Sequence, residues 1–322
     1  MKIDECKKFK KMIHNEAEAR GSVFTRRGWV AVLALTAAIA WGWAYPLIKM
    51  GFGEFHITSE MTGSKMLFAG IRFMLSGLII LAIAGGARRR FVVADSWRGW
   101  AYVVAFALVN TTLHYAFFYF GLSHSEGARA AILNSLSVFA VVIMACVMFK
   151  SDRLTASKIV GCVLGFAGIM ALNIGGGESG SFTWLGDGLI IMNALCGATA
   201  SLMTRGLSRR VDVFVGTGYS LALGGALLVV PGVAVGGTLP VVTVAGVVIL
   251  LLLTAISTIG FTLYNKLLSC NPIGRVAIFN SLIPVVGAVT SCLCLGEEFY
   301  WKYVVAGGLA AAGIFVINRG KR

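Results

Sequence analysis

The sequence predicts an all-α polytopic membrane protein, with ten transmembrane helices arranged as two inverted five-helix repeats. Apolar residues make up 57% of the 322 residues and charged residues only 13%, whereas soluble globular chains carry about 25% charged residues. The charged residues are clustered, and they leave apolar stretches of about 20 residues, which cross about 30 Å of hydrocarbon as helix. An internal repeat is the third observation, and it predicts the two halves.

The repeat is visible as a short motif that occurs twice. Residues 129–136 read RAAILNSL and residues 275–282 read RVAIFNSL, so six of the eight positions are identical at an offset of 146 residues. Upstream, Leu122-Ser123 recurs as Leu268-Ser269 at the same offset. The chain therefore contains two copies of one unit, which predicts two halves of similar fold.

Each copy is expected to supply five membrane spans. The first copy covers residues 28–174 and the second covers residues 184–318, with polar tails at 1–27 and 319–322 and a Gly-rich linker at 175–183. The expected spans, in order, are Gly28–Met50, Met66–Ala84, Trp97–Gly121, Gly127–Phe149, Ser157–Ile174, Trp184–Leu207, Val213–Val230, Val242–Leu268, Ile273–Leu295 and Trp301–Ile317.

The Lys and Arg residues predict the orientation. With a cytoplasmic N-terminus, 23 of the 28 Lys and Arg residues fall in cytoplasmic tails and loops, and cytoplasmic loops carry such an excess. Both termini are therefore expected inside and the linker outside. The same distribution accounts for the net charge of +14 without a nucleic-acid partner. Because five spans is an odd number, the second copy enters the membrane upside down, an arrangement typical of transporters.

Polar and aromatic side chains inside the expected spans are the candidate substrate-binding residues. A polar group inside a bilayer is costly, so it faces either a partner or a water-filled cavity. For each asparagine, a bond between helices and a contact with a ligand both stay open. The deep aromatic rings either line a cavity for an amphiphilic solute or pack in the core. The candidates are Trp41, Tyr45, Asn110, His114, Tyr115, Asn134, Asn193, Ser257 and Asn280.

Three arginines are also placed for a role in transport. Arg129 begins the fourth expected span on the outer side, and Arg275 begins the ninth on the inner side, so each is either a gate or an interfacial anchor. Arg72 lies six residues into the second expected span. It either extends to the membrane surface, pairs with a carboxylate such as Glu126, or binds a carboxylate of the substrate.

Small residues recur at spacings of three or four in the fifth and tenth expected spans. Such spacing lets helix backbones approach closely, either within the bundle or at a homodimer contact. We expect no part of the substrate site there. These residues are Gly161, Gly165, Gly168, Gly308, Ala311 and Ala312.

The chain lacks the motifs of other membrane-protein classes. It contains no HExxH motif, no GxSxG motif and no pair of carboxylates inside a span, so an intramembrane enzyme is disfavoured. The Gly-rich linker lacks the GK[ST] of a phosphate-binding loop. The seven cysteines show no CxxC spacing. We therefore expect no catalytic residue, cofactor or metal. The expected partners are a small solute, the lipid bilayer and a second copy of the chain in a homodimer, and not a nucleic acid.

Taken in order, the motifs resemble those of the drug/metabolite transporter superfamily, EamA type, from Gly28 to Arg319. Trp41-Gly42 in the first copy corresponds to Cys196-Gly197 in the second. The remaining matching motifs are Arg72-Phe73, the aromatic run from Tyr115 to Leu122, the two RxAIxNSL motifs, and Leu295-Gly296-Glu297. The resemblance implies a ten-helix bundle that exports small metabolites, often amino acids or their relatives, across the bacterial inner membrane by alternating access.

Two positions depart from the symmetry of the repeat. Val138 stands where the second copy has Pro284, so a helix break is expected in only one half. Asp152 stands where the second copy has Glu297, which preserves a capping role. An importer and a carrier of sugar phosphates or nucleotide sugars remain alternatives, although strongly anionic solutes would need several cations in the cavity.

The acidic residues bear on energy coupling. Asp187, at the outer end of the sixth expected span, is the most deeply embedded of the 14 acidic residues. Because no carboxylate lies near the membrane centre, we expect facilitated export without obligatory proton antiport. His114 is the deep titratable group, and it is the candidate coupling site if that expectation is wrong.

Overall fold

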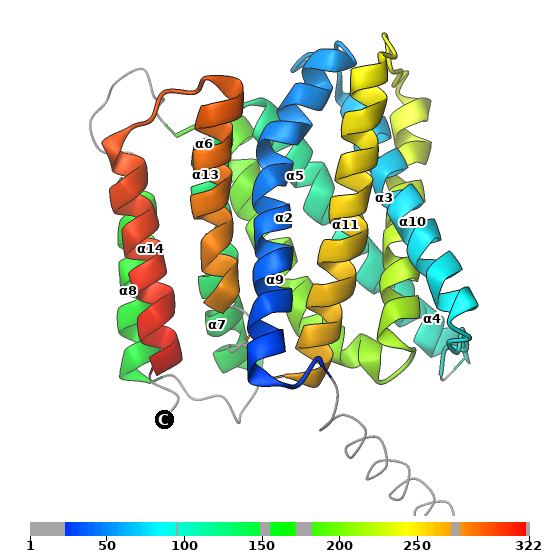
Figure 1. The fold of residues 1–322 in the computed structure, drawn as a ribbon, viewed down its shortest axis with the longest axis horizontal. Helices are drawn as coiled ribbons and strands as arrows, with labels where there is room; N and C mark the ends of the chain where they lie inside the picture. The colour runs from blue at the N-terminus through cyan, green and yellow to red at the C-terminus, as the bar shows by residue number, and fades with distance from the viewer. Residues whose placement is uncertain are drawn as a thin grey trace, which may run out of the picture.

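The computed structural model describes residues 23–94, 96–148, 155–171, 182–271, 276 and 278–319. The regular structure of these residues is entirely helical and forms ten rods that run side by side (Figure 1), which confirms the expected fold class. The rods are α2 (Arg27–Glu54); α3 (Thr62–Gly86); α4 (Ser96–Ala107), η1 (Leu108–Leu113) and α5 (His114–Ser123); α6 (Gly127–Asn134) and α7 (Leu136–Met148); α8 (Ala156–Ala171); η2 (Trp184–Gly188) and α9 (Leu189–Ser208); α10 (Val213–Ala234); α11 (Val244–Cys270); η3 (Ile278–Ser281) and α13 (Leu282–Leu295); and α14 (Trp301–Arg319).

Seven helical stretches of the described residues are long and apolar enough to cross a membrane, and two shorter apolar helices, Ala156–Gly168 and Leu282–Leu295, accompany them. The bundle also keeps large apolar side chains on its outside; Ile83 is 63% exposed and Leu293 is 79% exposed. Such a surface suits contact with lipid. The chain is therefore a multi-pass membrane protein.

The two repeats run in opposite directions. The η2 segment that precedes α9 lies against the end of α5, where Gly186 O approaches Gly121, and the end of α9 lies against the start of α4, where Gly206 meets the Tyr102 ring. The rod of α4 and α5 therefore runs antiparallel to α9. The chain reverses direction once before and once after α3, so the rod of α4 and α5 runs parallel to α2. The first span of the first repeat, α2, therefore runs antiparallel to the first span of the second repeat, α9.

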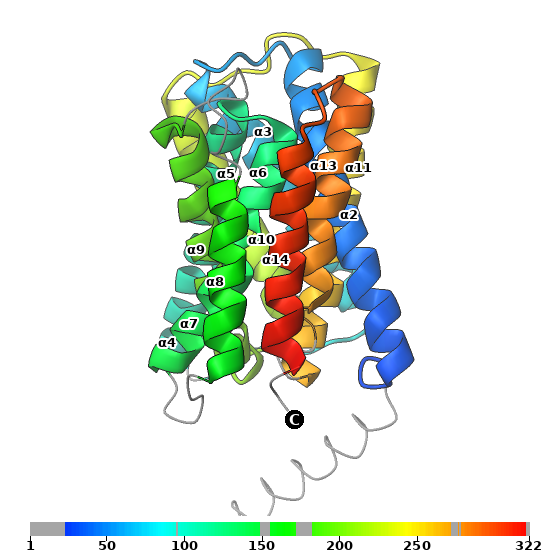
Figure 2. The same cartoon turned by 90° about the vertical axis from the view of Figure 1, so that its left-hand side faces the viewer.

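Equivalent helices of the two repeats pack against each other. Helix α3, the second span, lies along α10, the seventh, and α8, the fifth, lies along α14, the tenth (Figures 1 and 2). Both contacts depend on glycine, because a Cβ on Gly77 would lie 2.2 Å from Ala222 N, and one on Gly313 would lie 2.4 Å from Gly161 O. Gly161, Gly165 and Gly168 of α8 are buried within the bundle, whereas Gly308 and Ala312 of α14 are exposed, and a homodimer stays a prediction.

The expectation of a helix break in only one half is wrong. The fourth span divides between α6 and α7 although it has Val138 where the second repeat has proline. Ser135 N donates to Ile132 O at 3.0 Å, and Val138 N donates to Ser135 O at 3.1 Å. These tight turns interrupt the α-helical hydrogen bonds without a proline. In the ninth span, the 3₁₀ segment η3 precedes α13, and Pro284 is the third residue of α13, where proline is tolerated.

Some expectations fall on residues outside the described ranges. They concern most of the N-terminal tail (1–22), the capping role of Asp152 (within 149–154), most of the linker with the end of the fifth span (172–181), Arg275 with the start of the ninth span (272–275), and most of the C-terminal tail (320–322).

Candidate functional site

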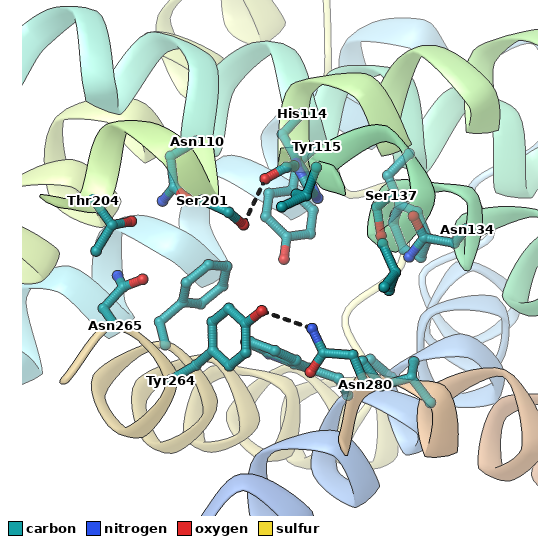
Figure 3. Close-up of a pocket in the computed structure, with 18 of the residues that line it drawn as sticks. Asn110, His114, Tyr115, Asn134, Ser137, Ser201, Thr204, Tyr264, Asn265 and Asn280 are labelled. Atoms are coloured by element: carbon teal, nitrogen blue, oxygen red, sulfur yellow. Dashed lines mark hydrogen bonds between the residues drawn. The ribbon is translucent and has the colours of Figure 1, made fainter. Parts of the chain in front are cut away.

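A cavity of about 130 Å³ lies between the two repeats. A single water needs at least about 10–15 Å³ of such space, so the cavity accommodates a small organic solute. Its wall combines residues of α2, α3, η1, α5, α6 and α7 from the first repeat with residues of α9, α11, η3 and α13 from the second (Figure 3). A position between inverted repeats is where transporters bind their solutes.

Aromatic side chains form much of this wall. The Trp41 ring centroid lies 5.4 Å from that of Phe261 and 5.1 Å from that of Tyr264, and the Tyr45 and Phe118 centroids are 5.3 Å apart, all edge to face. This is the preferred geometry of aromatic pairs. The rings come from α2, α5 and α11, so the apolar surface spans both repeats. The lining rings are Trp41, Tyr45, Tyr115, Phe118, Phe261 and Tyr264.

The two asparagines of the repeated motif make matching contacts. Asn134 Nδ2 donates to the Tyr45 hydroxyl at 2.9 Å. Asn280 Nδ2 donates to the Tyr264 hydroxyl at 2.7 Å (Figure 3). Asn193 Nδ2 donates to Asn134 Oδ1 at 2.8 Å and does not itself line the cavity. Both motif asparagines lie at helix breaks, and each joins helices while it lines the cavity.

A π-helical segment, η1, carries the polar residues of the third span. Asn110 Nδ2 donates to Ser220 Oγ at 3.1 Å, and Thr112 Oγ1 donates to Gly224 O at 3.1 Å, so α10 holds this segment in place. Asn110 within η1 and His114 directly after it both line the cavity. Short π-helical segments are frequent at functional sites because they change the direction of side chains.

Two buried polar atoms of the cavity wall have no hydrogen-bond partner among the described residues. They are Trp41 Nε1 and His114 Nδ1. The His114 ring instead packs on Tyr115, with centroids 4.6 Å apart. A buried polar atom without a partner is costly, so a hydrogen bond that Trp41 Nε1 donates to a solute, or that His114 Nδ1 makes with one, would stabilise that atom.

Arg72 neither extends to the membrane surface nor pairs with Glu126, which were two of the three roles that the sequence left open. It is 1% exposed, so it does not extend to the surface, and Glu126 instead accepts a hydrogen bond from the Tyr303 hydroxyl. Arg72 Nε donates to Leu253 O at 3.0 Å and to Ser257 Oγ at 2.8 Å, and the side chain lines the cavity. Ser257, itself a candidate substrate-binding residue, does not line the cavity and orients Arg72 instead.

Arg129 is buried in an ion pair. Its Nε donates to Asp187 Oδ1 at 2.8 Å and its Nη2 donates to Asp187 Oδ2 at 2.6 Å, and the two residues are 4% and 2% exposed. Thr183 N also donates to Asp187 Oδ2, at 3.3 Å. This bidentate pair connects α6 of the first repeat to η2 of the second.

A second ionic contact connects the repeats at the same end of the bundle. Glu297 accepts hydrogen bonds from Gly127 N at 2.9 Å, from Ala128 N at 3.1 Å and from Lys49 Nζ at 2.9 Å. A carboxylate at the start of α6 satisfies two free backbone donors and suits the helix dipole. The end of the bundle where α6 begins is thus tied across the two repeats.

The comparison with known proteins agrees with this architecture. The EamA-like transporter family matches residues 28–174 and 184–319. The chain belongs to this family. It is a family of transporters and not of enzymes.

The relatives are full-length but distant. The uncharacterized transporter YvbV of Bacillus subtilis is 24% identical over 296 residues, covering 89% of this chain and 91% of YvbV. A probable amino-acid metabolite efflux pump of Escherichia coli is 23% identical over 302 residues (88% and 93%), and a probable terminal-alkyne amino-acid exporter of Streptantibioticus cattleyicolor is 24% identical over 297 residues (90% and 93%). One solved crystal structure shares the fold, with a TM-score of 0.68 and 18% identity over 92% of this chain and 100% of that chain.

In this EamA transporter, sequence reasoning missed several polar residues of the wall. Asn265 lines the cavity and lies 146 residues after Tyr119, so it is the repeat equivalent of a residue in the aromatic run of the third span and could have been identified from the repeat offset. Ser201 and Thr204 lie one turn apart on α9, a spacing that could have identified them. Ser137 had no comparable signal.

Proposed function

We propose that this EamA transporter exports small organic metabolites, namely amino acids or related amphiphilic solutes, from the cytoplasm of a bacterium by alternating access. The observation that carries the proposal is the cavity between the inverted repeats, in which aromatic rings alternate with amide and hydroxyl groups. Such a wall binds an apolar body and orients a polar end. The names of the Escherichia coli and Streptantibioticus cattleyicolor relatives refer to amino-acid export, which favours this solute class.

Residues Trp41, Tyr45, Asn110, His114 and Tyr115 are proposed to contact the solute. Asn134 and Asn280 are proposed to do so from the two helix breaks, with Asn193 and Ser257 behind them as supports for Asn134 and Arg72. Each motif asparagine is bonded to a tyrosine of its own repeat, and Asn134 also accepts a hydrogen bond from Asn193 of the second repeat, so a solute that displaces the Asn134 contacts would act on both repeats.

The Arg129–Asp187 pair is the proposed outer gate. It joins the two repeats and is removed from water, so it opens only as a unit when the repeats move apart. In the same conformation, two cavity-lining residues, Thr204 and Asn265, lie within two turns of the ends of α9 and α11. These helix ends lie at the end of the bundle opposite the Arg129–Asp187 pair. Phe118 lies equally near the end of α5 on the gate side, so the cavity reaches toward both ends, and Arg275 is proposed as the counterpart gate on the side of the termini because it is the repeat equivalent of Arg129.

Facilitated, gradient-driven efflux is the proposed energetics. The described residues that line the cavity include no Asp or Glu, and Asp187, the most embedded acidic residue, is held by Arg129. A carrier without a free carboxylate at its solute site has no acidic group to exchange a proton for solute there. His114 is the remaining titratable group of the wall.

Efflux from proteoliposomes tests the function. Amino acids and related amphiphiles that raise the thermal stability of the purified protein would be loaded, and efflux is expected down their own gradient with no pH gradient. Ser201→Trp fills the cavity and should abolish efflux, whereas Leu195→Trp, on the exposed side of the same helix, should preserve it. Wild-type efflux no faster than from protein-free liposomes refutes the function. Efflux that requires a proton gradient and is lost in His114→Ala refutes the energetics alone.

A further inference from the structure

We propose that Arg72 binds a carboxylate group of the transported solute, so that the preferred substrate is a small monocarboxylate with an apolar body rather than an amine. The inference rests on the proposed function, because it takes the cavity between the repeats as the transport site. It adds the charge of the substrate and the residue that recognises that charge.

The guanidinium of Arg72 is fixed in place but has hydrogen-bonding capacity left. Its Nε–H is shared by Leu253 O and Ser257 Oγ, and one Nη1–H is donated to the Tyr119 hydroxyl at 2.9 Å. A guanidinium has five N–H groups. The second Nη1–H and both Nη2–H groups therefore have no partner among the described residues, and Arg72 lines the cavity. The neutral contacts hold the side chain in one orientation, and donors remain for a ligand.

The charge of Arg72 is not balanced by any carboxylate of the described residues. Besides its hydrogen bonds to Leu253, Ser257 and Tyr119, the side chain contacts the face of the Phe73 ring, 4.9 Å from the Arg72 Cζ atom, and none of these groups has a net charge. A buried cation without a counter-ion is costly. An anion bound in the cavity would relieve that cost, whereas an ammonium group would add a second positive charge.

The rest of the wall indicates one anionic group on an apolar body. Arg72 has the only permanent charge among the described residues that line the cavity. A carboxylate accepts two parallel N–H groups from one guanidinium. A phosphate dianion would call for a second cation. Lys65, the other buried cation of α3, does not line the cavity and is bonded to Ser59 O and Ser123 Oγ.

Binding of four probes with one aromatic body tests the inference. Phenylacetate, phenylacetamide, 2-phenylethylamine and phenyl phosphate would be titrated into the purified wild-type protein, with tryptophan fluorescence and thermal shift as readouts. Phenylacetate is expected to bind roughly ten- to a hundred-fold more tightly than phenylacetamide, as hydrogen bonds to a charged group imply. Phenylethylamine is expected to bind more weakly than the amide.

Variants then assign the preference to Arg72. Arg72→Gln should bind phenylacetate no better than phenylacetamide while it still binds the amide. Arg72→Lys should retain part of the preference for the anion, because lysine keeps the positive charge but cannot form two parallel hydrogen bonds to a carboxylate. Lys65→Gln removes an equally buried cation outside the cavity and should keep the full preference. Arg72→Gln with an unchanged preference for the anion overturns the inference.

The relative affinities of the four probes for the wild-type protein test the inference even if Arg72→Gln fails to fold. Failure of phenylacetate to bind, or binding no tighter than that of the amide or the amine, overturns the inference. So does tighter binding of phenyl phosphate, which would identify a phosphate monoester as the ligand. If neutral or cationic solutes leave the proteoliposomes while phenylacetate does not bind, only the assignment to Arg72 fails. If no solute of any charge leaves, the proposed function fails.

Discussion

Two buried arginines, Arg72 and Arg129, differ in how their charges are compensated. Arg129 has a bidentate carboxylate partner from the opposite repeat, whereas Arg72 has neutral partners and a free edge toward the cavity. The sequence located both arginines inside expected spans but could not assign their partners. Asp187 lies 58 residues from Arg129, and only the packing of α6 against η2 brings the two together.

Removing one member of the Arg129–Asp187 pair should destabilise the protein more than removing both. Asp187→Asn leaves a buried charge uncompensated and should cost about 3–5 kcal/mol, whereas replacing both residues by apolar ones is often close to neutral. Thermal unfolding in detergent of Asp187→Asn and of the double variant Arg129→Met, Asp187→Leu measures this difference. Arg89→Gln, which breaks the exposed Arg89–Asp212 pair, should cost at most about 1 kcal/mol.

The same variants separate a gate from a purely structural pair. In a cysteine-free background with Ser137→Cys in the cavity wall, the double variant should react faster with an impermeant maleimide added from the outer side. The gate is refuted if the reaction rate equals that of the background protein while the double variant is stable.

Helix ends and interruptions position most of the cavity wall. The sequence predicted the spans and their repeat, because apolar runs and the 146-residue offset are readable from composition and identity. It did not predict the π-helical segment η1, since one extra residue in a turn leaves no change in hydropathy. The sequence did not reveal the break at Ser135, because tight turns interrupt the helix there without a proline. Interruptions made by polar side chains and tight turns depend on neighbouring helices, such as α10 beside η1.

At the start of α6, Glu297 should act as a cap supplied by the other repeat. Glu297→Ala frees the amides of Gly127 and Ala128 and the ammonium of Lys49, so the free energy of unfolding should fall by about 1 kcal/mol. Hydrogen exchange of the two amides should accelerate. Glu298→Ala, which removes the exposed neighbouring carboxylate, is the matched control and should change neither quantity. Equal exchange in the two variants would contradict the capping role.

Over the whole molecule, the pairing of equivalent helices explains how an inverted duplication becomes one bundle. Helix α3 meets α10 and α8 meets α14, so each repeat completes the packing surface of the other. Because the described residues form an even number of rods, α2 begins and α14 ends at the same end of the bundle (Figure 1). That end is also where the cavity wall reaches Thr204 and Asn265. The assignment of Arg129–Asp187 as the outer gate therefore depends on which side of the membrane this end faces.

The distribution of Lys and Arg predicts that this end faces the cytoplasm, and cysteine labelling tests it. Ser59, in the exposed connection between α2 and α3, and Thr155, exposed before α8, lie at opposite ends of the bundle. In a background without the seven native cysteines, Ser59→Cys should react with an impermeant maleimide on intact cells, and Thr155→Cys should react only after lysis. Twenty-three of the 28 Lys and Arg residues favour this orientation. The reverse pattern would place the Arg129–Asp187 end inside the cell and contradict its assignment as the outer gate. Labelling of both positions on intact cells would contradict a single orientation.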